Sequence, residues 1–189
     1  MSSIVNNLQY PATIETAGLT LKAVTPALLN ELIISLSPEE FMHYIGIDAS
    51  EYAHYQAMHT LGMETHRISL YFFLLVHKAD NIVIGDCGFH TWNRTHRRTE
   101  LFYNLRNTAY RNKGLMKEAL AAVIAYGFTH LNLNRIEALV AKENEPSVKL
   151  IKGNGFTFEG TMREDYVVDG KPDDSDCYSL LLREWLEKK

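Results

Sequence analysis

The spacing of hydrophobic residues changes along the chain, and each change marks a different kind of element. Apolar and polar residues alternate over residues 18–24, which predicts a strand. Helical spacing follows behind Thr25 and Pro26, which suit the N-cap and the first position of a helix. A second helix is predicted over residues 50–66, and residues 37–48 are expected to form the loop between the two helices.

After the second helix the hydrophobic period shortens to that of strands. Two strands are predicted over residues 68–78 and 82–92, joined by a hairpin turn at Asp80 and Asn81. The apolar run from Leu70 to Val76 is too short to span a bilayer and predicts a buried strand. A third strand is expected over residues 99–105.

The last third of the chain alternates between the two periods. Apolar residues at helical spacing predict a long helix after Gly114, and a strand is expected over residues 135–141. Asn144 suits the N-cap of a further helix, and strands are predicted over residues 156–168 and 177–185. The face of the long helix comprises Met116, Leu120, Val123, Ile124, Gly127 and Leu131. This order predicts a mixed α/β sheet in which both βα units place adjacent strands in parallel.

Composition limits the class of protein. The 189 residues are 46% hydrophobic and 22% charged, which predicts one domain over residues 1–189. A formal net charge of −4 gives no support to nucleic acid or an anionic membrane as partner. Cys87 and Cys177 form no motif, and the start of the chain lacks a signal-peptide pattern, so a reduced, cytoplasmic setting is expected. The spacing of the histidines predicts no metal site.

The stretch YRNKGLMKEAL, from Tyr110 to Leu120, places a basic turn directly before the long helix. A glycine in such a turn gathers free backbone N–H groups at the positive end of a helix dipole, where an anion can bind. Gly114 would let a ligand approach the backbone closely, although a glycine at a helix start is also an ordinary structural feature. The segment matches neither a Walker A loop nor GxGxxG, which disfavours nucleotide hydrolysis and dinucleotide binding.

The pattern Arg111-x-x-Gly114-x-Met116 is similar to the pyrophosphate loop of the GCN5-related N-acetyltransferases (GNAT). RRTELFYNL before it and RIEALVAKENEPSVKLIKGNGFTFEGTMRE after it resemble further landmarks of this family, in the same order. Residues 80–184 carry the likeness, and it is greatest to the branch that acetylates the N-termini of ribosomal proteins. The resemblance implies a central, mostly antiparallel sheet with one parallel, splayed strand pair, flanked by helices. It also implies acetyl-CoA as co-substrate and no metal.

In this family the loop amides hold the pyrophosphate of acetyl-CoA, and the preceding strand pairs with the pantetheine arm. An open strand edge suits such an amide-bearing arm. By resemblance, the cofactor-binding residues are Tyr103, Asn104, Leu105, Arg111, Asn112, Lys113, Gly114, Leu115, Met116, Asn144 and Ser147. For Asn144 an N-cap role without a ligand is equally compatible with the sequence.

Glu100 is the candidate general base, because amide formation needs an unprotonated amine and relatives use a carboxylate at this position. The alternative is an exposed strand glutamate paired with Arg97 or Arg98. Many relatives protonate the leaving thiolate with a tyrosine, but the matching position here is Ile151. A thiolate with a pKa of about 8.5 leaves tolerably without full protonation. Ser147 and Tyr178 are the two residues considered as substitutes, and Ser147 is retained as a candidate catalytic residue.

The acceptor amine is expected opposite the cofactor, at a wall formed by residues 37–48 and by the loop that joins the last two strands. The acidic residues of the second loop favour a cationic substrate, although a solvated hairpin is the more common explanation for such a run. Asp169, Asp173 and Asp174 are the predicted substrate-binding residues. A protein N-terminus is the expected acceptor, with a polyamine, an aminoglycoside or a non-catalytic acyl-CoA sensor as alternatives. The chain is expected to be a monomer or a homodimer.

Overall fold

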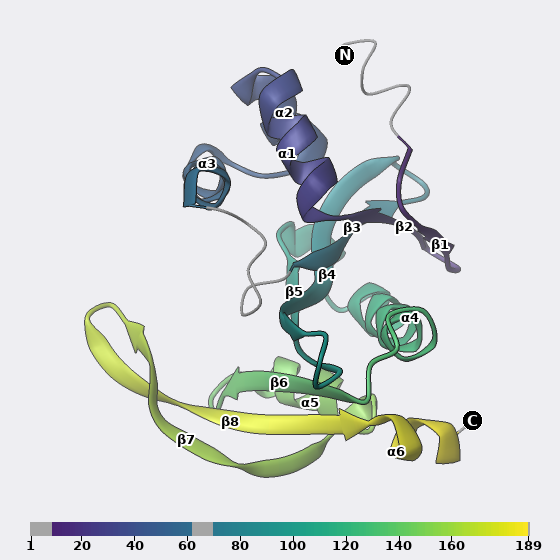
Figure 1. Ribbon diagram of the computed structural model, residues 1–189, viewed down its shortest axis with the longest axis vertical. Helices are drawn as coiled ribbons and strands as arrows, with labels where there is room; N and C mark the ends of the chain where they lie inside the picture. Colours follow the sequence, from purple (N-terminus) through teal and green to yellow (C-terminus); the bar gives the residue numbers. More distant parts are fainter. Residues whose placement is uncertain (1–8, 62–69, 189) are drawn as a thin grey trace.

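A computed structural model describes residues 9–61 and 70–188, which form one eight-stranded mixed sheet flanked by helices (Figure 1). The strand order is β1-β2-β3-β4-β5-β6-β8-β7, and only β5 and β6 are parallel neighbours within these residues. The strands are β1 (Thr13–Glu15), β2 (Leu19–Val24), β3 (Tyr71–His77), β4 (Ile82–Asn93), β5 (Arg98–Leu105), β6 (Arg135–Ala141), β7 (Thr157–Val168) and β8 (Lys171–Leu181). The helices are α1 (Pro26–Ser35), α2 (Pro38–Ile45), α3 (Ala49–Leu61), the short 3-10 helix η2 (Thr108–Tyr110), α4 (Leu115–Thr129), α5 (Glu145–Gly153) and α6 (Leu182–Glu187).

The predicted mixed sheet with one parallel pair is confirmed, but one detail of its topology is wrong. Both βα units were expected to place adjacent strands in parallel. The unit β5–α4–β6 does so, whereas β8 lies between β6 and β7 and pairs antiparallel with each. Strands β7 and β8 are joined by a tight hairpin, and β8 occupies the position beside β6. A parallel crossover through α5 would have placed β7 there.

Three element predictions are also wrong. The expected loop over residues 37–48 contains helix α2, which Ser37 and Glu40 start with a reciprocal capping box and Gly46 ends in a left-handed conformation. Strand β1 was not predicted, and the last predicted strand ends at Leu181, where helix α6 begins. The predicted second helix is confirmed as α3, and its expected residues 62–66 lie outside the described residues.

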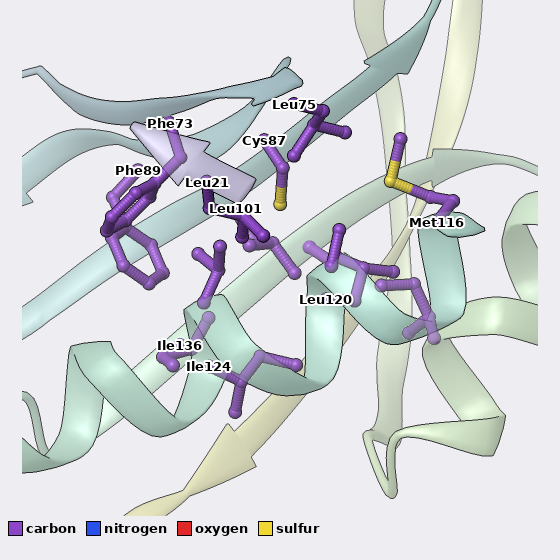
Figure 2. Packing of buried hydrophobic residues seen from close by; sticks show 14 of the residues in the cluster. Leu21, Phe73, Leu75, Cys87, Phe89, Leu101, Met116, Leu120, Ile124 and Ile136 are labelled. Carbon is purple, nitrogen blue, oxygen red and sulfur yellow. The ribbon is translucent and has the colours of Figure 1, made fainter. Parts of the chain in front are cut away.

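Two hydrophobic clusters cover the two faces of the sheet. Helices α4 and α5 pack on one face, and Figure 2 shows Leu120 and Ile124 of α4 meeting side chains of several strands. Helices α1, α2 and α3 pack on the other face. Strand β3 lies between both layers, since Phe73 belongs to the first cluster and Phe72 to the second. This position explains why its sequence is continuously apolar.

Strands β5 and β6 separate soon after they meet. Their parallel register covers only residues 98–100 of β5, whereas β6 continues beside β8 to its end. The edge of β5 beyond Glu100 is therefore left without a strand partner among the described residues, and a wedge opens between the two halves of the sheet. This is the splayed pair that the family resemblance implied.

Candidate active site

The turn before α4 presents backbone N–H groups without partners. The first hydrogen bond of the helix runs from the N–H of Glu118 to the carbonyl of Gly114 over 3.0 Å. Among the described residues, none accepts a hydrogen bond from the N–H groups of residues 112–117, as expected at a helix start without a cap. The N–H of Arg111, by contrast, is already donated to the carbonyl of Thr108 (3.1 Å). The turn can therefore bind an anion with amides that follow Arg111.

The backbone conformation at position 114 favours glycine, because its φ of +78° lies in the left-handed region. A Cβ added there would meet no atom of the described residues within 4 Å, so it would point into open space. Asn112 also has a positive φ, of 60°. Left-handed residues in a turn are a common part of the backbone concavities that bind anions.

A cleft of about 340 Å³ lies beside this turn, between the end of β5 and the first turn of α5. It brings together several predicted cofactor residues from distant parts of the chain. Lys117 and Lys149 add positive charge to its wall, and Glu145 adds one negative charge. Of the predicted residues, the cleft is lined by Leu105, Asn112, Gly114, Leu115 and Met116.

The remaining predicted cofactor residues lie around or away from this cleft. Arg111 and Lys113 are exposed and do not line it, although Lys113 lies 5.3 Å from the ring centroid of Tyr110. Asn144 caps α5 by accepting a hydrogen bond from the N–H of Ser147 (3.2 Å). Asn104 projects to the opposite face of the sheet, because successive side chains of a strand alternate.

Tyr103 and Ser147 meet across the wedge. The hydroxyl groups of these two residues are hydrogen-bonded, which links β5 to the first turn of α5. Burial is the main cause that raises the pKa of Tyr103, so the phenol is protonated at neutral pH. Tyr178, considered from the sequence as another proton donor, is buried in the core cluster instead. Ile151 is fully buried and has no part in the cleft.

Glu100 lies at the point where β5 and β6 separate. In the sheet it is opposite His90 of β4 and Glu137 of β6, and its side chain is 18% exposed. The structure does not show the alternative pairing with Arg97 or Arg98. Instead, Glu100 Oε1 lies 3.5 Å from His90 Nε2.

Burial, the largest cause, and the neighbouring charges of Glu137 and Asp165 together raise the pKa of Glu100 to about 7. Burial also lowers the pKa of His90, so this histidine is mostly neutral at pH 7 and does not offset these effects. A carboxyl group with a pKa near the working pH is suited to accept a proton from a bound amine.

Sequence reasoning missed the neighbours of Glu100. Asp165 lies in a bulge of β7, where the register with β8 shifts between Met162 and Tyr166. Its Oδ2 atom is buried without a hydrogen-bond partner among the described residues. Bulges re-aim side chains next to functional sites, but strand alternation alone gives no sign of them. The sequence signal for this neighbour was the acidic run itself, which contains Asp165 beside the predicted Asp169, Asp173 and Asp174.

The predicted substrate residues of the hairpin have local structural roles. Asp169 and Gly170 both have positive φ values, 49° and 76°, which fits the two-residue turn that Asp-Gly favours. Asp174 accepts a hydrogen bond from the N–H of Glu164 (3.0 Å), and Asp173 accepts one from the N–H of Asp174 (2.9 Å). The structure does not bring these three side chains next to Glu100. Any action of theirs on the acceptor would therefore be long-range electrostatic attraction.

A second pocket, of about 880 Å³, lies on the opposite face of the sheet, under α3. Phe102 and Asn104 of β5 line it, together with His90. Within the described residues, no group of three or more His, Cys, Asp or Glu side chains is arranged to hold a metal ion. In the same residues, no helix has the length and apolar character needed to cross a membrane.

The family model for an acetyltransferase (GNAT) domain matches residues 18–157. The uncharacterized N-acetyltransferase YoaA of Bacillus subtilis is 30% identical over 173 residues, which cover 89% of this chain and 96% of that protein. The uncharacterized N-acetyltransferase p20 of Bacillus licheniformis is 42% identical over 113 residues, or 60% of this chain. That match spans 63% of the length of p20, less than two thirds.

Solved structures show the same fold at low identity. The ribosomal-protein-S5-alanine acetyltransferase of Vibrio fischeri aligns with a TM-score of 0.66 and 18% identity, covering 92% of this chain and 98% of that one. Mutant forms of the spermidine/spermine N-acetyltransferase of Vibrio cholerae align with a TM-score of 0.68 and 22% identity, covering 92% and 99%. Because both identities are below 25%, these likenesses establish the fold and leave the acceptor open.

Proposed function

Because the chain belongs to the GNAT acetyltransferase family, we propose that it transfers the acetyl group of acetyl-CoA to the N-terminal amine of a protein or peptide. The observation that carries this proposal is the wedge between β5 and β6. The turn around Gly114, which can bind an anion, lies at one end of this wedge. The carboxyl group of Glu100, with a pKa of about 7, lies at the other end. The active unit is the acyltransferase domain, residues 1–189, and a cytoplasmic setting suits its free cysteines.

The residues at the turn fit acetyl-CoA. Its diphosphate requires hydrogen-bond donors, and the amides that follow Arg111 are available at the positive end of α4. Its pantetheine arm carries amide groups, and the open edge of β5 at residues 103–105 can pair with them as a strand would. When bound, acetyl-CoA supplies a thioester whose carbonyl carbon is attacked by the acceptor amine.

Glu100 removes the proton from that amine. At neutral pH a substantial fraction of Glu100 is ionised, and the carboxylate attracts the incoming ammonium group before accepting its proton. We assign to Tyr103, which is hydrogen-bonded to Ser147, the donation of a proton to the departing thiolate. Ile151 occupies the position at which many relatives carry a proton-donating tyrosine. One proton is thus taken from the amine and one is given to the thiolate.

The pH dependence tests this assignment. The rate kcat/KM for one fixed acceptor should rise with pH through about 7, as Glu100 becomes ionised. Because the charge of Glu137 raises the pKa of Glu100, the substitution Glu137→Gln should shift this rise to lower pH. The full pH profile of both proteins measures the shift.

Glu159→Gln is the matched control for that measurement. Glu159 and Glu137 both pair with Arg135, over 2.8 and 2.7 Å, but Glu159 is not among the charges that raise the pKa of Glu100. Its substitution should leave the profile in place. An unchanged profile in Glu137→Gln, or an equal shift in both variants, would show that Glu100 is not the titrating group.

The acidic hairpin is expected to act through long-range attraction alone. Replacing Asp169, Asp173 and Asp174 with Asn keeps local hydrogen bonds possible and removes their charge. At low salt the KM for a cationic acceptor should rise while kcat stays nearly constant. The difference should shrink toward 1 M salt, where the Debye length falls to about 3 Å. Equal KM values for both proteins at low salt would identify the hairpin as a solvated loop.

The release of thiol from acetyl-CoA across a panel of acceptors tests the function itself. The panel contains N-terminal peptides, spermidine and an aminoglycoside. Peptides and spermidine are included because the solved relatives are named as a ribosomal-protein and a spermidine/spermine acetyltransferase. Efficient release with peptides supports the proposal. Release with spermidine alone would establish a polyamine acetyltransferase instead. Binding of acetyl-CoA without release for any amine would establish a non-catalytic sensor.

A further inference from the structure

The pocket under α3 is mostly apolar in its lining. Its volume of about 880 Å³ lies within the range of pockets that enclose a drug-sized ligand. Tyr55 and Met58 of α3 form one wall, and Phe72 and Phe102 of the sheet form the floor. These side chains favour an apolar ligand, because its burial removes apolar surface from water on both partners.

Arg106 pairs with both carboxylates that line this pocket. Arg106 donates hydrogen bonds to Glu51 (3.0 Å) and to Asp86, and these two are the pocket's only carboxylates among the described residues. Burial raises the pKa of Asp86, and the Arg106 guanidinium counteracts that rise. A second ammonium group, such as a polyamine carries, would have to compete with Arg106 for carboxylates that this guanidinium already engages.

The pocket is continuous with the surroundings of the candidate base. His90 lines it, and His90 Nε2 lies 3.5 Å from Glu100 Oε1. Glu100, Phe102 and Asn104 alternate along β5 and therefore share this face of the sheet. The uncompensated acidic charge lies at this end, where Asp165 Oδ2 has no partner among the described residues. One ammonium group is thus favoured at Glu100 and apolar substituents are favoured beyond it.

We propose that this pocket binds the first two residues of a peptide acceptor, with large apolar side chains, while the α-amine of the peptide reaches Glu100. The inference rests on the proposed function and narrows its acceptor to N-termini that begin with residues such as leucine or phenylalanine. Polyamines and N-termini with small polar residues are poor substrates in this arrangement, because they leave the apolar lining in contact with water.

The test compares kcat/KM for three acceptors: a peptide beginning Leu-Leu, the same peptide beginning Ser-Ser, and spermidine. The Leu-Leu peptide should be preferred at least tenfold over the other two, since about 10-fold or more is typical for a single methylene group in an apolar pocket. A preference for spermidine or for Ser-Ser would overturn the inference and leave acetyl transfer to amines standing. If no acceptor reacts although acetyl-CoA binds, the proposed function fails together with it.

Two substitutions on α3 test whether this pocket causes the preference for the Leu-Leu peptide. Ala57 lines the pocket and is exposed, so Ala57→Trp should partly fill it and lower kcat/KM for the Leu-Leu peptide about fivefold. The value for Ser-Ser should change little. Ala53→Trp is the control, because Ala53 is an exposed residue one turn earlier on the same helix that does not line the pocket. Equal losses in both variants, or equal losses for both peptides, would show that the pocket does not select the acceptor.

Discussion

Glu100→Gln should lower the rate of acetyl transfer by about 10² or more, which is the usual effect of removing a general base. Glutamine preserves the size of the side chain and its place between His90 and Glu137, but it cannot accept the proton of an ammonium group. The affinity for acetyl-CoA should be nearly unchanged, because Glu100 does not line the cleft beside the turn around Gly114. Single-turnover rates and calorimetric titration measure the two quantities separately.

The stability of the same variant provides its control. The pKa of Glu100 is raised from 4.5 to about 7 on folding, so the contribution of this one group to stability is fully present below pH 4.5 and is lost as the pH rises through about 7. Glutamine removes this loss, and at pH 8 the variant should unfold at no lower temperature than the parent protein. A low rate in a destabilised variant would indicate misfolding. A full rate at neutral pH in a stable variant would show that the base lies elsewhere.

Gly114→Ala should weaken the binding of acetyl-CoA at least tenfold, or by about 1.4 kcal/mol or more. The added Cβ would point into the open space in front of the helix, where the diphosphate is proposed to bind. The substitution also strains the backbone, because φ is +78°, and in that region a residue with a Cβ is typically less stable by about 1–2 kcal/mol. Calorimetry and thermal unfolding must therefore be measured together.

Gly170→Ala separates the two effects. Gly170 has a φ of +76° and, like Gly114, no atom of the described residues within 4 Å of an added Cβ, but it lies in the β7–β8 turn. Both variants should lose a similar amount of stability, and only Gly114→Ala should lose affinity for acetyl-CoA. Equal affinities would mean that the glycine serves the backbone conformation alone and that the diphosphate binds elsewhere.

Local patterns made most elements and the anion turn predictable. Gly114 was identified from its neighbours in sequence, because a helix start is defined within a few residues. Helix α2 was missed although Ser37, Glu40 and Gly46 carry local capping signals, since the short stretch between two longer helices was interpreted as a loop. A reciprocal capping box satisfies free N–H groups at the start of even a short helix, so these signals outweigh the shortness of the stretch.

The environment of Glu100 could not be predicted in the same way. His90, Glu137 and Asp165 come from three other strands, and their approach depends on strand register and on a bulge in β7. The sequence indicated a carboxylate at this position, but its raised pKa depends on burial and on charges brought close by the fold. The hydrogen bonds of Asp173 and Asp174 depend on strand register in the same way.

The early separation of β5 and β6 has a consequence for motion in the protein. Strand pairing between the two halves of the sheet is confined to residues 98–100, so opening of the wedge breaks few backbone hydrogen bonds. Amide protons along the unpaired edge of β5 should exchange with solvent quickly in the free protein, because exchange follows the stability of each local unit. The pantetheine arm of acetyl-CoA, bound along that edge, would accept hydrogen bonds from these amides as a neighbouring strand does. Those amides should then exchange slowly, and the two halves should unfold as a single cooperative unit.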